Sequence, residues 1–130
     1  MTLTTLQPPG WPRPVGYANG IAATGRLVFV AGQVGWNSRS TFDSDRLSDH
    51  VRQALRNILA ILAEAGGGPQ DIVRLTWFIA SAAEYHAAIK DVGAAYREVM
   101  GKHFPAMSVL QVAGFVEPGA KVEIEATAVV

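Results

Sequence analysis

Residues 47 to 80, LSDHVRQALRNILAILAEAGGGPQDIVRLTWFIA, contain a helix, the end of that helix and a strand. Apolar side chains recur every three to four residues between Leu47 and Leu62, which is the spacing of one face of a helix. The run of residues 66–69, Gly-Gly-Gly-Pro, ends the helix, because proline cannot continue its hydrogen-bond ladder. The β-branched and aromatic run from Ile72 to Ala80 predicts a strand.

The chain after this unit predicts one more helix and two more strands. A helix is expected from about Ala82 to Met100, and Gly101 stops it. Strands are expected from Met107 to Phe115 and from Lys121 to Val130. The turn at residues 117–119, Glu-Pro-Gly, separates them.

The chain before this unit predicts an arm, a hairpin and a loop. Residues 1–16 hold four of the seven prolines, which cannot donate to a sheet ladder, so this part is expected to be an extended N-terminal arm. Two strand-like runs follow, from Tyr17 to Ala23 and from Leu27 to Gly32, and the glycine in residues 24–26 suits a tight β-hairpin turn. Residues 33–44 show no periodicity and are expected to form a loop.

This order, β-β-α-β-α-β-β, predicts an α+β fold that forms a single domain over residues 1–130. Each helix joins strands that we expect to be parallel, and such crossovers are right-handed, so both helices fall on one face of one sheet. The other face then has no helix to cover it, although the strand from Leu27 to Ala31 is apolar throughout. Another subunit is the natural cover. The alternative is a monomer whose proline-rich arm folds across that face.

The composition restricts the function classes. Hydrophobic residues make up 49% of the chain and charged residues only 17%, which favours burial of some apolar surface against other chains. Eleven basic and eleven acidic residues give no net charge, so neither nucleic acid nor an anionic membrane is an expected partner. The absence of cysteine excludes disulfides, zinc-thiolate sites and thiol nucleophiles. The N-terminus is not leader-like and no apolar run is long enough for a membrane span, so the expected location is cytoplasmic. No metal site is expected, because the spacing of the histidines does not match that of metal ligands: His50, His86 and His103.

Four short motifs resemble segments of one protein family. Residues 15–20 (VGYANG) and 28–33 (VFVAGQ) are similar to its G-P-Y-S-Q-A and V-F-V-S-G-Q segments. Residues 104–108 (FPAMS) and 122–126 (VEIEA) are similar to a Pro-Ala motif and to its closing strand. The four motifs occur in the family's order and span almost the whole chain, which is therefore identified as a member of the Rid (YjgF/YER057c/UK114) family.

This resemblance implies a chorismate-mutase-like fold (bacillus type) assembled as a homotrimer, with small-molecule clefts between subunits. It also implies an activity: the best-known branch hydrolyses reactive enamines and imines to 2-keto acids and ammonia, with no metal or cofactor. In that branch an arginine after the Pro-Ala pair clamps the substrate carboxylate. Met107 holds that position here, and Ala31 and Val109 replace polar residues of the branch, so the chain resembles a divergent branch without the clamp.

The resemblance also implies site residues. Glu123 matches the family's cleft carboxylate, which positions a water for attack on the imine carbon. Tyr17 matches a cleft-wall tyrosine contributed by the adjacent subunit, and Gly32, Met107 and Val109 fall in cleft motifs. Glu123 also has a purely structural interpretation, because charged side chains that alternate along a strand are often only solvated or paired.

Another cation could take the place of the missing arginine. Arg74 lies in the strand from Ile72 to Ala80, on the face that carries Thr76 and Phe78, and from there could reach a subunit interface. The alternative role for Arg74 is an ion pair with Glu125. Arg13 and Arg52 are weaker candidates, since arginines on arms and helices usually face water.

Two functions remain open at this level. The first is a hydrolase or deaminase for a small imine or enamine, weak or altered because Met107 offers no hydrogen-bond donor. The second is a trimer that binds a small metabolite without turning it over. Ribonuclease activity, a label attached to the family, is the weakest reading because the chain has neutral charge and no basic aromatic patch.

Overall fold

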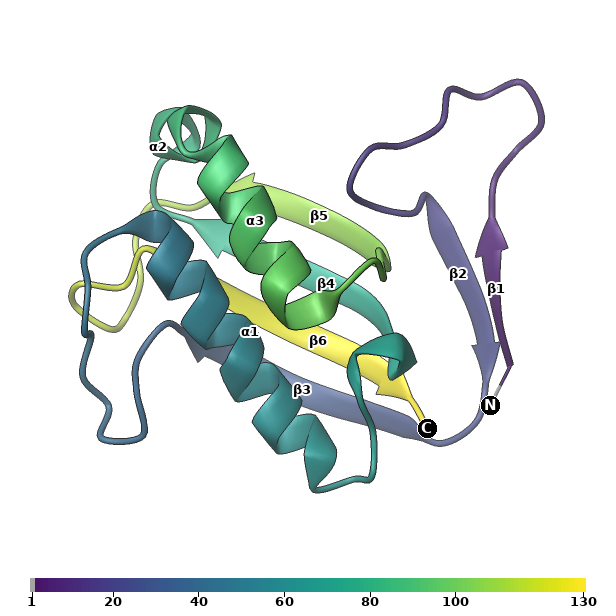
Figure 1. The fold of residues 1–130 in the computed structure, drawn as a ribbon, viewed down its shortest axis with the longest axis horizontal. Helices are drawn as coiled ribbons and strands as arrows, with labels where there is room; N and C mark the ends of the chain where they lie inside the picture. The colour runs from purple at the N-terminus through teal and green to yellow at the C-terminus, as the bar shows by residue number, and fades with distance from the viewer. Residues whose placement is uncertain (1) are drawn as a thin grey trace.

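The computed structural model describes residues 2–130, with a four-stranded sheet at its centre (Figure 1). The strands lie in the order β3-β6-β4-β5, with bounds β3 Leu27–Val34, β6 Val122–Val129, β4 Ile72–Ile79 and β5 Ala106–Gln111. β6 is antiparallel to both of its neighbours, whereas β4 and β5 are parallel. The two strands joined by each helical crossover therefore run in the same direction, as the sequence predicts.

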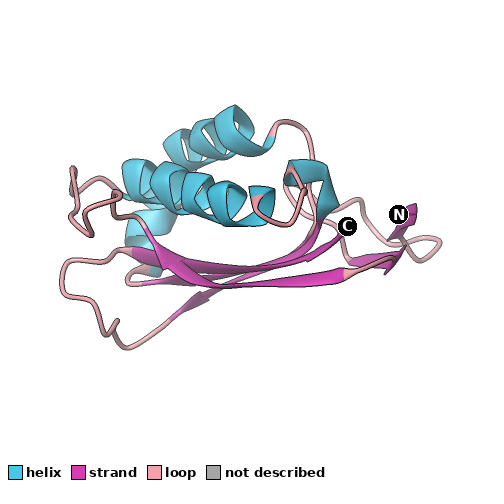
Figure 2. Cartoon of the chain, turned by 90° about the horizontal axis from the view of Figure 1, so that it is seen from below, coloured by secondary structure: helices cyan, strands magenta, loops and turns pink. Residues whose placement is uncertain are grey.

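All helices lie on one face of this sheet, and Figure 2 shows the opposite face without a helix. α1 (Leu47–Ala63) connects β3 to β4 through a short 3-10 turn (Pro69–Asp71). The predicted helix from Ala82 to Met100 is in fact two helices, α2 (Ala82–Ala87) and α3 (Ile89–Met100), because the backbone leaves the helical region at Ala88. Gly101 has a φ of 67° and ends α3, as expected. The α+β fold with helices on one face is confirmed.

The predicted hairpin between residues 17–23 and 27–32 is wrong. β2 (Gly20–Thr24) pairs with β1 (Thr2–Leu6) in a separate two-stranded sheet, and β3 pairs with β6 instead. The prolines of the arm begin at Pro8, so residues 2–6 keep the backbone N–H groups that a strand needs. A bond from Ala18 N–H to the Pro105 carbonyl (3.0 Å) ties this segment to the start of β5.

The hydrophobic core fills the space between the sheet and the helices. Its largest fully buried side chains come from α1, β4 and β6, and include Leu55, Ile58, Leu62, Ile72, Leu75 and Ile124. The uncovered face of the sheet differs: Phe29 is 74% exposed and Leu110 is 47% exposed. No helix within residues 2–130 is long and apolar enough to cross a membrane.

Candidate functional site

Glu123 lies on the uncovered face of the sheet, next to a glycine of β3. It faces Phe78 across the β6-β4 pair, and its side chain is half-buried. A Cβ atom at position 32 would lie only 2.8 Å from Glu123 Cδ. Any side chain there would overlap the carboxyl group, so residue 32 must be glycine for Glu123 to keep this position.

The β3 strand is irregular at this point. Its register against β6 shifts between Val30 and Gln33, the stretch that contains Ala31 and Gly32. The Gln33 side chain donates to the Ala31 carbonyl at 3.1 Å, which satisfies one backbone group that the irregular ladder leaves free. Such bulges occur at sheet edges and next to active sites, where they change the direction in which a side chain points. Here the bulge exposes both Ala31 and Gly32 beside the carboxylate.

A second group of predicted residues lies on the helix side of the sheet. Met107 faces Leu75 and Val109 faces Trp77 across the β5-β4 pair, so both belong to the face that the helices cover. Together with Tyr17 they line a cavity of about 520 Å³ between β5, α2, α3 and the segment before β2. The other lining residues are Val15, Gly16, Trp77, Tyr85, Ile89, Val92, Gly93, Tyr96, Arg97 and Phe104.

Stacked aromatic rings form the inner wall of this cavity. The Tyr96 ring lies between Trp77 (centroids 6.2 Å apart) and Phe104 (5.4 Å, planes within 11°). The Tyr96 hydroxyl donates to the His103 carbonyl at 2.6 Å, and burial raises the pKa of Tyr96 well above its ordinary value. The wall is therefore rigid, neutral and apolar on the side that faces the cavity.

Arg97 also lines this cavity, and the sequence did not point to it. The position where Gly93 would carry a Cβ lies 3.3 Å from Arg97 Nη1, so the guanidinium lies against the helix where Gly93 leaves space. The two residues are one turn apart on α3. The sequence signal that could have indicated Arg97 is Gly93. A glycine in a helix interior lowers helix stability by about 1 kcal/mol relative to alanine, so its presence there suggests a packing or functional role.

The two groups do not meet within one chain. Gly32 and Glu123 lie together on the uncovered face, whereas Tyr17, Met107 and Val109 lie together on the helix side. The prediction that Met107 shares a cleft with Glu123 therefore requires a second copy of the chain, and so does the pairing of Glu123 with Tyr17.

Arg74 belongs to neither group. It lines a shallow hollow on the uncovered face, with Phe29, Ala31 and Glu125. It faces Thr127, whereas Glu123 faces Phe78, and four residues along a strand correspond to about 13 Å. The expected ion pair between Arg74 and Glu125 is not among those formed by residues 2–130.

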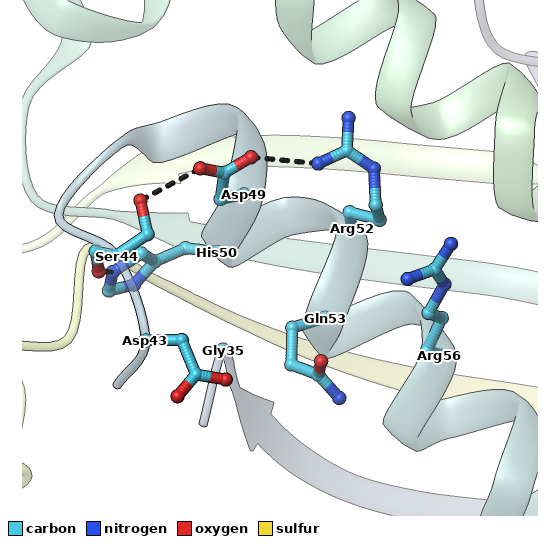
Figure 3. A pocket seen from close by; sticks show the side chains of 8 residues that line it. All are labelled: Gly35, Asp43, Ser44, Asp49, His50, Arg52, Gln53 and Arg56. Atoms are coloured by element: carbon cyan, nitrogen blue, oxygen red, sulfur yellow. Dashed lines mark hydrogen bonds and ion pairs between the residues drawn. The ribbon is translucent and has the colours of Figure 1, made fainter. Parts of the chain in front are cut away.

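A separate polar pocket of about 300 Å³ lies at the start of α1 (Figure 3). The Ser44 hydroxyl donates to Asp49 at 2.8 Å, and Arg52 donates to the other oxygen of that carboxylate at 2.8 Å. These two bonds, the Ser44 bond foremost, hold the pKa of Asp49 below its ordinary value of 3.8. Arg52 and Arg56 also pair with Glu98, so both arginines of the pocket are already engaged.

The histidines have structural roles where the contacts define them. His50 is buried and stacks on Phe42, with Nε2 2.6 Å from the Ser44 carbonyl. His103 Nε2 lies 2.7 Å from the Ile72 carbonyl and so joins the end of α3 to β4. Within the described part of the chain, no three His, Asp or Glu side chains gather closely enough to hold a metal ion.

Two named proteins are similar in sequence to nearly the whole chain. A 2-iminobutanoate/2-iminopropanoate deaminase of Dermatophagoides farinae is 31% identical over 120 residues, which are 92% of this chain and 90% of the relative. The human protein of the same name is 28% identical over 128 residues, 98% of this chain and 88% of that protein.

Solved structures give the same grouping. A Yersinia pestis protein of the conserved Rid family, YyfB, described as of unknown function, has a TM-score of 0.84 at 30% identity, with both chains fully covered. A Mycobacterium tuberculosis member of the YjgF/YER057c/UK114 family has a TM-score of 0.67 at 33% identity, over 89% of this chain and 88% of that one. The family model described as Endoribonuclease L-PSP matches residues 12–130, and the chain belongs to this family, also known as Rid or YjgF/YER057c/UK114.

Proposed function

We propose that this chain is a Rid-type hydrolase that deaminates a small imine or enamine in clefts between the subunits of a homotrimer. The observation that carries the proposal is the half-buried Glu123 carboxylate held against Gly32, on a face of the sheet with no helix. The two deaminases similar to this chain over most of their length support the reaction class.

The reaction needs a base that directs water to an electrophilic carbon. In the proposed step, Glu123 accepts a proton from water while the water oxygen bonds to the imine carbon, and it returns this proton to the nitrogen as the C=N double bond becomes single, which gives a tetrahedral carbinolamine. The proton of the carbinolamine hydroxyl then passes to the nitrogen, the carbon–nitrogen bond breaks as the carbonyl forms, and ammonia leaves. The products are a 2-keto acid and ammonia, and the step requires only water besides the substrate.

The same geometry supports the proposed trimer. The uncovered face carries Phe29 and Leu110, which are large, apolar and exposed in a single chain. Stable interfaces bury such side chains, and a closed ring of three chains would cover every copy of this face. The ring also supplies the missing half of each site, with Glu123 and Gly32 from one chain and Tyr17, Met107 and Val109 from the next.

The test replaces the carboxylate alone. In Glu123→Gln, the side chain keeps its shape but loses its basicity, so we expect at least a hundredfold fall in kcat. A coupled assay that generates the imine in place and follows the 2-keto acid measures it. Glu125→Gln is the matched control, because it removes the same charge two residues along the same strand face. Equal activity of Glu123→Gln and the unaltered protein would refute the assignment.

One observation favours the alternative of a trimer that binds a metabolite without turnover. Met107 offers no donor to a carboxylate, so turnover of the smallest substrates is expected to be poor. An unaltered protein with no activity on any imine tested, yet with measurable binding of the matching 2-keto acid, would establish this second function.

A further inference from the structure

We propose that Arg97 on α3 binds the ligand carboxylate, and that the cavity beside it selects acids whose other end is a bulky apolar group. The reacting species, an aromatic or branched 2-imino acid, rests on the proposed function. The binding site itself does not, because it is argued from the cavity alone.

The cavity between β5 and α3 has a single charged side chain in its lining, which among the described residues is Arg97. The pocket at the start of α1 contains both Asp49 and Arg52, and the hollow on the uncovered face contains both Arg74 and Glu125. A fourth hollow, of about 280 Å³ between β2 and the start of β5, also has one charged lining residue, Arg74, but the hollow with Glu125 shares that arginine. Among these four, the cavity between β5 and α3 has the largest volume, and no carboxylate lies among the residues that line it beside Arg97, which suits an anion.

The Arg97 guanidinium is free to take such a partner. None of the ion pairs within residues 2–130 includes it. Its neighbour Glu98 is directed to α1 instead, where it pairs with Arg52 and Arg56. A guanidinium presents two parallel N–H donors to a carboxylate, so one side chain can hold and orient the acid group.

Gly93 gives the Arg97 guanidinium room to lie against α3. A Cβ at residue 93 would lie 3.3 Å from Arg97 Nη1, which is tight enough to displace the guanidinium by a few tenths of an ångström. A glycine in the middle of α3 weakens the helix, and its gain here is the space in which the arginine lies at the cavity wall.

The rest of the lining defines the other end of the ligand. The buried rings of Trp77 and Tyr96 lie behind Phe104 at the back of the cavity. The accessible apolar surface includes Tyr17, Ile89 and Val109. A volume of about 520 Å³ is in the range of small-molecule sites. A three-carbon acid would leave most of this apolar surface unfilled, whereas a phenyl or branched alkyl group would cover it.

Calorimetry with phenylpyruvate and its uncharged amide tests the proposal on the full-length protein. We expect the acid to bind at least tenfold more tightly than the amide. In Arg97→Gln this preference should vanish, with roughly a ten- to thirtyfold weaker binding of the acid. Arg97→Lys should keep part of the preference for the acid over the amide. Pyruvate should bind at least tenfold more weakly than phenylpyruvate to the unaltered protein.

Lys90→Gln is the matched control, because it removes the same charge from the same face of α3 two turns away, about 10 Å, outside the cavity lining. Equal effects of Arg97→Gln and Lys90→Gln would reduce the role of Arg97 to a distant charge and overturn the proposal. So would equal binding of acid and amide, or of pyruvate and phenylpyruvate.

The two proposals fail in distinguishable ways. If the chain has no deaminase activity but phenylpyruvate binds in an Arg97-dependent manner, the proposed function is wrong and the site stands. If the chain deaminates imines, Arg97→Gln should raise KM and leave kcat within about twofold. Unchanged KM in Arg97→Gln would exclude Arg97 as the anchor while the role of Glu123 stands.

Discussion

On one face of the four-stranded sheet, Leu75 and Ile124 are fully buried beneath the helices; on the other, which has no helix, Phe29 and Leu110 are exposed. Both faces come from the same strands, because successive side chains point to opposite sides. The covered face therefore determines whether one chain folds. The uncovered face carries Glu123, Gly32 and the apolar surface that we propose the trimer buries, so in our proposal it governs assembly and supplies the carboxylate, while the ligand cavity lies on the helix side.

The largest effect is expected on the covered face. Leu75→Ala removes a fully buried side chain and should lower the free energy of unfolding by about 2–5 kcal/mol, measured by urea denaturation. Thr76→Ala is the matched control, one residue along β4 and directed to the uncovered face, and should change the stability of the chain by less than about 1 kcal/mol. Similar losses in both variants would contradict the division between the two faces.

The second effect concerns assembly. We expect light scattering to give the mass of a trimer at micromolar concentration, and Phe29→Glu to reduce it to that of a single chain, because the new carboxylate would be buried without a partner. The control Ser38→Glu adds the same charge to an exposed loop and should leave the mass unchanged. A single-chain mass for the unaltered protein would remove the basis for the trimer.

The third effect tests the divergent position. Met107→Arg places a second guanidinium in the cavity that Arg97 lines, which shortens the space available to the ligand. Turnover of 2-aminoacrylate-type imines should rise about tenfold, and binding of phenylpyruvate should fall. Ala94→Arg, an added arginine on the exposed side of α3, should do neither. If Met107→Arg lost turnover of both the small imines and the larger aromatic ones, the result would argue against carboxylate binding at position 107.

The sequence predicted the fold wherever local pattern and burial agreed. α1 and β4 lie within a few residues of their predicted bounds, since their periodicity reflects the face they bury. Pairing was harder to predict. β2 and β3 are adjacent in the sequence and joined by a glycine turn, but β2 pairs with β1 and β3 with β6. The pattern of residues 17–32 carries no information about these distant partners.

The candidate site was only partly accessible to sequence reasoning. Motifs indicated Glu123, Gly32, Tyr17 and Met107, but not that they divide between two faces of the sheet, because facing depends on the register of β5 against β4. Arg97 was missed for a related reason. The sequence signal for Arg97 is Gly93, one helical turn earlier on α3. That signal can be interpreted only once the structure shows β5 and the aromatic side chains packed beside α3.

The smallest effect lies outside both faces, at the start of α1, and depends on pH. The pKa of Asp49 is lowered in the folded chain by the bonds from Ser44 and Arg52, so this carboxylate stabilises the fold above its ordinary pKa of 3.8. The contribution is lost as the pH falls through the lower folded pKa. Asp49→Asn should therefore be less stable than the unaltered protein above pH 5, and the difference should shrink below about pH 3.

Because the Asp49 side chain is 38% exposed, solvent screens this pairing and the difference should stay under about 1 kcal/mol. Asp45→Asn is the control, since Asp45 is exposed and forms no ion pair within residues 2–130. Thermal unfolding from pH 2.5 to 7 separates the two variants. A constant gap between Asp49→Asn and the unaltered protein over that range would mean that packing at α1, and not the charge of Asp49, stabilises this end of the helix.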